Sequence, residues 1–231
     1  MEQPAGEDRA SPRARRQLAQ QALTREQLLD TAEAMFSENG FDGTTLRAIA
    51  EAVEMSVGAV YLVFENKEAL YQAVFARQSE SFHSPPFLAA ITRDESAFDR
   101  LEALVEYVLD FYRHHSTYTR LVLRHVGATL FTGADFVDPL LSEAYVSTNR
   151  EIVTEVIEYG QARGEFRPGD SSTMNRFLSA IMLTHLAGDP ALVGTTTATT
   201  PFPPAELLSL VRRVFEPLDA TPQVSPDRAG T

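Results

Sequence analysis

The segment that decides the fold is residues 44–64, TTLRAIAEAVEMSVGAVYLVF. Its apolar residues first recur at the spacing of a helix, stop at a short break, Glu54-Met55-Ser56, and then resume. Ser56 is one of the residue types that cap helix starts, so it marks where the second run begins. The pattern predicts two short helices, over residues 45–53 and 57–64, joined by a tight turn.

Two short helices across a tight turn form a helix-turn-helix when small and apolar residues occupy the crossing. Ala50 is a small residue at the point where the second helix must cross the first. The second helix opens on small groups at Gly58 and Ala59, which would let its N-terminus enter a major groove and offer N–H groups to phosphate. A packed helical hairpin without a binding role is the competing interpretation. The apolar wedge between the helices comprises Ile49, Val53, Met55 and Val60.

Helices are also predicted on both sides of this segment. Thr24 followed by Gln27 is a capping-box pattern, which predicts that the preceding helix starts there. Asn39-Gly40 predicts its end, because glycine readily takes the left-handed conformation of a helix stop. Asn66 can cap a fourth helix, and the pair Pro85-Pro86 forbids that helix from continuing.

Several motifs follow one another in a recognisable order along residues 24–75. They are Glu38-Asn39-Gly40-Phe41, Thr44-Thr45-Leu46-Arg47-Ala48-Ile49-Ala50, Gly58-Ala59-Val60-Tyr61, Phe64 and Asn66-Lys67-Glu68-Ala69-Leu70. Together they resemble the DNA-binding domain of the TetR family of regulators. The resemblance implies a homodimer in which an N-terminal three-helix domain reads DNA and a larger helical domain senses a small molecule. It implies repression through a palindromic operator until the small molecule releases the protein.

The resemblance also implies which residues touch DNA. Thr45 and Arg47 would contact backbone phosphate, as would Tyr61 and Lys67. The start of the second motif helix and Leu62 would face the bases. The predicted DNA-binding set is Thr45, Arg47, Ser56, Val57, Gly58, Ala59, Tyr61, Leu62 and Lys67.

Three positions depart from the family pattern. Glu54 stands where glycine is usual, and a non-glycine residue in a left-handed conformation costs about 1 kcal/mol. Val57 and Val63 stand where the family usually has polar or basic side chains. Residues 57–64 therefore carry no charged side chain, so a bidentate arginine–guanine contact cannot come from this helix. Recognition is expected to rely on phosphate, shape and thymine-methyl contacts.

Charge is unevenly distributed along the chain. The net charge of −12 argues against a general nucleic-acid binder, whereas residues 9–20 hold four arginines and no acid. That stretch either reaches the minor groove of DNA or stays a solvated tail. Because the sequence has no cysteine, no signal peptide and no apolar run of membrane length, a cytoplasmic protein without a membrane partner is expected. The predicted domains are a disordered basic arm, 1–20; the helix-turn-helix domain, 21–66; a helical effector-binding and dimerisation domain, 67–218; and a flexible tail, 219–231.

The rest of the chain is predicted to be helical, which makes the fold all-α with about nine helices. Two apolar stripes near the C-terminus must be buried, either between subunits or inside one subunit. The candidates for a dimer interface are Leu178, Ile181, Met182, His185, Leu207, Val211, Val214 and Leu218. The candidates for binding an unidentified small-molecule effector are Tyr107, Phe111, His115, Tyr118, Arg124 and His125.

The sequence does not predict an enzyme. It has no glycine-rich phosphate loop, no His-Glu-x-x-His pair, no Gly-x-Ser-x-Gly elbow and no cysteine nucleophile. The adjacent His114 and His115 point to different faces of a helix, so neither a metal site nor a cofactor is expected. The remaining alternative is a helical dimer of the same fold that has lost sequence-specific DNA binding and acts through protein partners.

Overall fold

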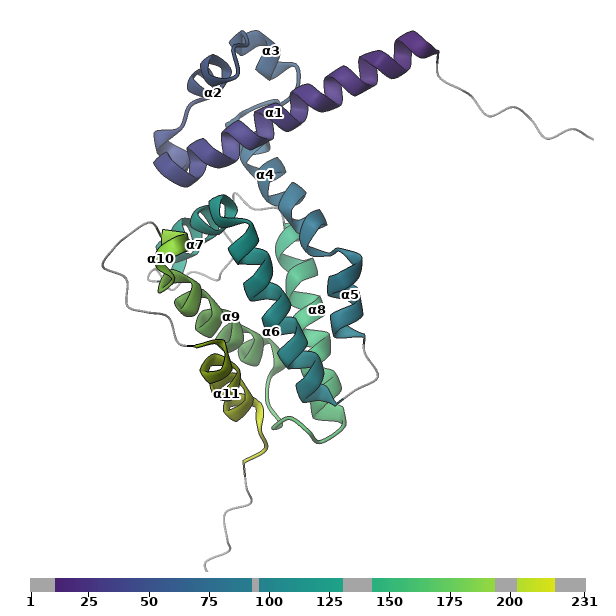
Figure 1. Cartoon of the computed structure of the whole chain (residues 1–231), viewed down its shortest axis with the longest axis vertical. Coiled ribbons are helices and arrows are strands. Elements are labelled where there is room, and N and C mark those ends of the chain that lie inside the picture. The colour runs from purple at the N-terminus through teal and green to yellow at the C-terminus, as the bar shows by residue number, and fades with distance from the viewer. Residues whose placement is uncertain (1–10, 93–95, 131–142, 194–202, 219–231) are drawn as a thin grey trace, which may run out of the picture. The chain divides into compact units, whose positions relative to one another are not determined.

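A computed structural model describes residues 11–92, 96–130, 143–193 and 203–218, and in these residues the chain forms eleven α-helices and no strand (Figure 1). The predicted all-α fold is confirmed, with more helices than the nine or so expected. The helices divide into two compact units. The described residues up to Ser79, together with those from Arg120 to Leu130, form the first unit, and the remaining described residues form the second.

The first unit contains the helix-turn-helix. Its elements are α1 (Pro12–Gly43), α2 (Leu46–Ala52), α3 (Val57–Tyr61), most of α4 (Lys67–Phe82) and the later part of α7 (Ser116–Leu130). Helix α4 belongs here because Tyr71 packs its ring edge-on against Phe36 of α1, with ring centroids 5.0 Å apart. The predicted domain boundary at residue 66 therefore lies too early. The fully buried core comprises Leu28, Ala32, Phe36, Ile49, Ala50, Val60, Leu70 and Val74.

Helix α1 begins well before the predicted start at Thr24. Ser11 caps it, since its hydroxyl accepts a hydrogen bond from the N–H of Ala14 at 3.3 Å. Pro12 then occupies the first position, where its missing N–H is not needed. The hydroxyl of Thr24 donates to the carbonyl of Gln20 at 2.9 Å, so Thr24 lies inside the helix. Residues 12–20 are therefore helical rather than a disordered arm, and residues 1–10 lie outside the described residues.

The predicted stop of α1 at Asn39-Gly40 is confirmed in its backbone. Gly40 has φ +75° and interrupts the helical geometry, although hydrogen bonding resumes as far as Gly43. A β-carbon at Gly40 would also lie 3.4 Å from the guanidinium of Arg124. Glycine is thus required for the left-handed φ, and it leaves room for the α7 side chain that packs there.

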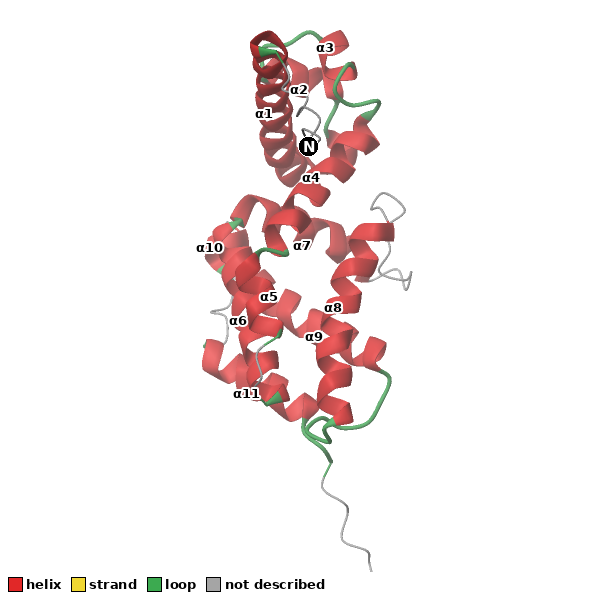
Figure 2. Cartoon of the chain, turned by 90° about the vertical axis from the view of Figure 1, so that its right-hand side faces the viewer, coloured by secondary structure: helices red, strands yellow, loops and turns green. Residues whose placement is uncertain are grey.

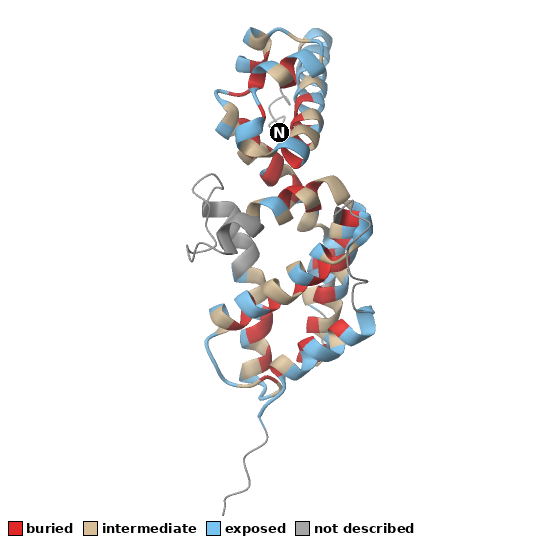
Figure 3. Cartoon of the chain, turned by 90° about the vertical axis from the view of Figure 1, so that its left-hand side faces the viewer, coloured by how far each residue is buried: buried red, intermediate tan, exposed pale blue. Residues whose placement is uncertain are grey.

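The second unit contains most of the remaining helices (Figure 2). They are α5 (Pro85–Ile91), α6 (Ala97–His114), the start of α7, α8 (Glu143–Ala162), α9 (Ser171–Ala187), α10 (Pro190–Val193) and α11 (Pro204–Phe215). Helix α6 packs against α5, α8 and α9, and α11 packs on α6 and α9. Within each unit the buried residues lie where helices face one another (Figure 3).

Two short helices of the second unit were not predicted. Helices α5 and α10 each start at a proline, Pro85 and Pro190. A proline pair ends the preceding helix, as predicted, but a proline also suits the first position of a new helix. Helices α5 and α10 were not predicted because proline was considered only as a residue that ends a helix.

The connection between α8 and α9 spans residues 163–170. Gly160 permits it, because a β-carbon there would lie 2.2 Å from the ring of Phe166. Phe166 is buried and packs its ring against Phe98 of α6 and Phe215 of α11, at 4.9 and 5.2 Å. The turn thus places one aromatic side chain at the point where several helices of the unit meet.

Candidate nucleic-acid interface

Helices α2 and α3 are each capped by a hydroxyl side chain. Thr45 accepts a hydrogen bond from the N–H of Ala48 at 3.1 Å, and Ser56 accepts one from the N–H of Ala59 at 3.1 Å. Between them Glu54 takes φ +56°. The left-handed turn that the sequence predicted at a non-glycine residue is therefore present, and the N–H of Met55 closes it onto the carbonyl of Ala50 at 2.8 Å.

Two of the four predicted wedge residues between α2 and α3 are fully buried, and the other two, Val53 and Met55, are half-buried. Ile49, Ala50 and Val60 have no exposed surface, and Phe64 is 4% exposed. The guanidinium of Arg25 lies over the ring of Phe64, 4.5 Å from its centroid, and so ties α1 to the end of this segment. The complete burial of Ala50 agrees with the small residue that the sequence predicted at the crossing of the two helices.

The outer face of α3 is exposed and uncharged. Leu62 is 89% exposed and Tyr61 is 54% exposed, while Gly58 is also on the surface. Val57 and Ala59 are half-buried. Because this surface is exposed, it is available to a partner such as a groove of DNA.

Arg47 is exposed, as a phosphate contact requires. Its guanidinium forms an ion pair with Glu51 one turn later, at 2.9 Å, and that pair raises the pKa of Arg47 through its hydrogen bond and charge. The two side chains are 80% and 65% exposed. Because an exposed ion pair of this kind contributes little, Arg47 can leave Glu51 for a phosphate at small cost.

Lys67 is placed differently from its predicted role as a phosphate contact. Its ammonium donates to the carbonyls of Phe41 and Thr44, at 2.8 and 3.1 Å. It also lies 4.0 Å from the centroid of the Phe41 ring. Two of its three donors are thus used inside the domain, where they hold the loop between α1 and α2 to the start of α4.

An ion-pair cluster that the sequence analysis missed joins α1 to α4. Arg77 of α4 contacts Glu26, Asp30 and Glu33 of α1 at 3.3, 2.6 and 2.8 Å. Burial lowers the pKa of Arg77, and the hydrogen bonds to Glu33 and Asp30 outweigh this and raise it. Gln78 also donates to Glu33 at 2.8 Å. The sequence signal for this cluster was the spacing of acids along one face of α1. It could not reveal Arg77, which lies 44 residues or more away along the chain.

The six predicted effector residues are divided between the two units. Tyr107, Phe111, His115 and Tyr118 belong to the second unit, while Arg124 and His125 belong to the first. The guanidinium of Arg124 donates to the carbonyl of Glu38 at 2.9 Å, and His125 is hydrogen-bonded to the hydroxyl of Tyr71 at 3.2 Å. Their contacts with α1 and α4 give these two residues a role within the first unit.

The four effector candidates of the second unit lie around an aromatic cluster. The hydroxyl of Tyr107 donates to the carbonyl of Phe82 at 2.7 Å and is hydrogen-bonded to Ser84 at 2.9 Å. Phe111 and Tyr118 are 6% and 2% exposed, and His115 stacks on Phe111 with ring centroids 4.2 Å apart. These side chains form part of the core of the unit as it stands.

Most of the predicted dimer-interface residues lie inside one subunit. Leu178, Met182 and His185 of α9 are at most 7% exposed, as are Leu207 and Val211 of α11. The alternative that the stripes pack within one subunit is correct for these five, because α11 packs directly on α9 and α6. Ile181 and Val214 are half-buried, and Leu218 is 77% exposed.

His185 illustrates the interior position of this stripe. It is 4% exposed, and Arg113 lies 3.5 Å from its Nε2. Burial, and then the charge of Arg113, lower the pKa of His185, while Asp189 opposes the shift. A neutral imidazole enclosed by its own chain does not provide a surface for a second subunit.

Metal-binding clusters and membrane-spanning helices are both absent from the part of the chain that the structure describes. Within those residues no group of His, Asp or Glu side chains is arranged to hold a metal ion. None of the described helices combines the length and the apolar character needed to cross a membrane.

Comparison with known proteins gives the family. Residues 28–74 match the family of bacterial regulatory proteins, tetR family. The chain is 24% identical over 144 residues to the probable HTH-type transcriptional regulator YttP of Bacillus subtilis (strain 168), a match that covers 62% of this chain and 67% of YttP. It is 40% identical over 65 residues to the probable acrEF/envCD operon repressor of Escherichia coli (strain K12), covering 28% and 30% of the two chains. These matches place residues 28–74 in the tetR family of bacterial regulatory proteins.

Solved tetR-family structures share its fold. The ketosteroid transcriptional regulator KstR2 of Mycobacterium tuberculosis superposes with a TM-score of 0.60 at 20% identity, over 84% of this chain and 95% of KstR2. A bacterial regulatory protein in the tetR family from Rhodococcus RHA1 gives 0.63 at 22% identity, over 84% and 98%. These identities establish the fold alone. Residues 28–74 thus match a family of bacterial regulatory proteins, and the chain shares the fold of solved transcription regulators.

Proposed function

We propose that this protein is a repressor of the tetR family that binds a palindromic operator as a homodimer and is released by a small molecule. The observation that supports DNA reading is the outer face of α3 and its C-terminal end, where Tyr61 and Leu62 are exposed next to the fully buried Val60. Base contacts then come from an apolar face, through thymine methyl groups and groove shape. Phosphate contacts come from Thr45, Arg47 and Tyr61, with Ser56, Val57, Gly58 and Ala59 at the start of α3 nearest the bases.

The proposed dimer surface is the outward face of α9 and α11. Phe177 is 60% exposed, and the half-buried Ile181 lies one turn further along α9 on the same face. Leu210, 43% exposed, and Val214 form the equivalent pair on α11. Exposed apolar side chains grouped in this way are typical of a surface between subunits, and a twofold dimer would present two copies of α3 to two operator half-sites.

The proposed effector is an unidentified small molecule that binds in the second unit. Support comes from the aromatic cluster of Tyr107, Phe111, His115 and Tyr118, which would suit a largely apolar compound with few hydrogen bonds. Release then requires that the compound bind one arrangement of the domains better than the DNA-bound one.

A gel-shift titration with the DNA upstream of the chain's own gene tests DNA reading. In low salt we expect a sequence-dependent shift with two chains per duplex, which scrambled competitor DNA does not abolish. A stable helical dimer that gives no such shift would instead support the alternative of a regulator that acts through protein partners.

Sedimentation velocity tests the dimer surface. Replacing both Phe177 and Leu210 with glutamate should convert the dimer to monomers, because it puts charges into an apolar contact. Leu88→Glu is the matched control, since Leu88 is 47% exposed on α5, away from this face. If the double variant sediments as the wild type does, the surface is wrongly placed.

A further inference from the structure

The amino-terminal turns of α1 form an exposed and purely basic helix. Between residues 12 and 25 they carry Arg13, Arg15, Arg16 and Arg25, and the first acid on α1 is Glu26. Each of these arginines is exposed, in a chain whose net charge is −12. The stretch is therefore a local concentration of positive charge on an otherwise acidic protein.

The amino-terminal turns of α1 continue past α3, on the side away from α2 (Figure 1). Arg25 connects this extension to the helix-turn-helix, because the guanidinium of Arg25 stacks on the ring of Phe64 shortly after α3. From Arg25 to Arg13 the helix rises by about 18 Å at ~1.5 Å per residue. That length corresponds to about five base pairs of duplex at ~3.4 Å each.

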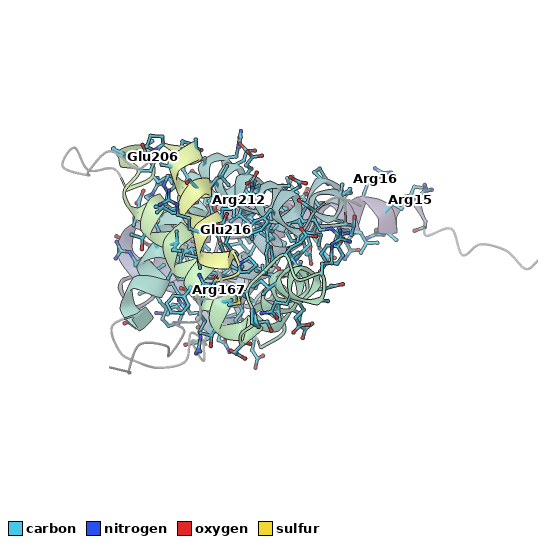
Figure 4. All side chains as sticks on the ribbon, turned by 90° about the horizontal axis from the view of Figure 1, so that it is seen from below. Arg15, Arg16, Arg167, Glu206, Arg212 and Glu216 are labelled. Atoms are coloured by element: carbon cyan, nitrogen blue, oxygen red, sulfur yellow. The ribbon has the colours of Figure 1, made fainter. Side chains whose placement is uncertain are left out.

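The sequence of the extension is not arranged for stability of the isolated helix. The first turn of α1 has no acid and contains arginines, although cations are unfavourable near a helix N-terminus. The side chains of Arg15 and Arg16 extend into open space from the end of the helix (Figure 4). A partner with regularly spaced negative charges would compensate for this arrangement.

A second copy of the chain fits the extension less well than DNA does. Leu18 and Leu23 are 60% and 53% exposed, and they are the only large apolar side chains between residues 12 and 25. A helix that packs on another helix usually presents three or four apolar residues in every two turns. The two leucines are too few for such a face, whereas four arginines match a polyanion.

We propose that residues 12–25 are a rigid extension of the DNA interface, in which Arg13, Arg15 and Arg16 contact backbone phosphates of the duplex that flanks the operator half-site. This inference rests on the proposed operator binding. It replaces the flexible arm expected from the sequence with a straight helix of fixed direction. Because phosphates are the same in every sequence, the extension adds affinity without adding base preference.

The test uses the full-length chain with Arg13, Arg15 and Arg16 all replaced by glutamine, a residue that preserves helix propensity. Binding is followed by fluorescence anisotropy over a series of salt concentrations, on an operator with ten flanking base pairs on each side and on one without flanks. Each phosphate contact contributes a slope of about −0.9 to the plot of log affinity against log salt. For three contacts per chain we expect the wild-type slope to be steeper by about 2.7 per chain.

The two probes provide a second readout. Removing the flanks should weaken wild-type binding and leave the triple glutamine variant unchanged. A variant with lysine at the same three positions keeps the charges and should retain most of the wild-type slope, and circular dichroism verifies that α1 persists. Arg176→Gln on α9 is the matched control, because Arg176 is also exposed and should not alter either readout.

Three results would overturn the inference. Equal slopes for wild type and glutamine variant, with operator binding intact, would refute the extension alone. A change in self-association on substitution would show that a second copy occupies the extension. Failure of the wild type to bind any operator sequence would refute the proposed function and this inference together.

Discussion

The helix pairs α2–α3 and α9–α11 were both predicted from apolar sequence patterns. Only the pattern in α2–α3 correctly indicated the surface against which its apolar residues pack. In α2–α3 the residues Ile49, Ala50 and Val60 are buried against each other, as the sequence predicted. In α9–α11 the stripe predicted to face a second subunit, with Leu178 and Leu207 among its members, is buried inside the chain. The difference lies in what each pattern specifies.

A helix-turn-helix specifies its own partner because the turn is so short. With α2 ending at Ala52 and α3 starting at Val57, the second helix can only pack on the first. A long amphipathic helix specifies only that a face is buried, and any apolar surface within reach satisfies it. The apolar face of such a helix therefore does not by itself reveal whether it packs within the chain or against a second subunit.

Leu207→Ala should lower the free energy of unfolding by about 2–5 kcal/mol, the usual cost of removing a buried leucine side chain. Leu207 is 1% exposed within one subunit, so the loss should be the same at any protein concentration. Urea unfolding at two concentrations tenfold or more apart measures this. A loss that grows on dilution would restore Leu207 to the interface between subunits.

Lys67→Met should lower the free energy of unfolding by about 1.5–3 kcal/mol, since hydrogen bonds to a charged group are worth that much. The methionine keeps the aliphatic stem and removes the ammonium that donates to the carbonyls of Phe41 and Thr44. Urea unfolding measures the loss, and Lys67→Arg is the comparison that keeps the charge. If stability is unchanged and only DNA affinity falls, the phosphate role predicted from the sequence is correct after all.

Tyr61→Ala should weaken operator binding about tenfold, or about 1.4 kcal/mol, with little change in stability. Its side chain is 54% exposed, so truncation removes little packing. Val60→Ala is the matched control one residue earlier, because Val60 is fully buried and should lose stability. Anisotropy with operator DNA and urea unfolding on both variants separate the two effects. Unfolding of the Tyr61 variant would assign Tyr61 to the core.

Features that depend on residues close together in the sequence could be predicted, whereas contacts between residues far apart in the sequence could not. The all-α fold, the crossing at Ala50 and the Glu54 turn depend on residues that are close together in the sequence, and each was predictable. The contacts of Lys67 and Arg77 depend on partners at least 23 residues away, which no local pattern reveals. The early start of α1 was missed because Thr24 and Gln27 resemble a capping box yet lie within a longer helix.

Glu54→Gly tests the smallest of these effects, the cost of a left-handed turn without glycine. Glu54 has φ +56°, which costs an ordinary residue about 1–2 kcal/mol relative to glycine. Glycine in turn loses about 0.5–1 kcal/mol in conformational entropy on folding, so the net gain should be at most about 1.5 kcal/mol. Urea unfolding measures it, and Glu51→Gly within α2 is the matched control, expected to lose about 1 kcal/mol.

The opposite signs expected for Glu54→Gly and Glu51→Gly make the comparison decisive. Both remove an exposed carboxylate and add the same flexibility to the unfolded chain, so those contributions largely cancel between the variants. Glu51→Gly also removes the ion pair with Arg47, which contributes little because it is exposed. What remains is the backbone: helical at Glu51 and left-handed at Glu54. A loss of stability in both variants would mean that the Glu54 side chain stabilises the turn by more than its conformation costs.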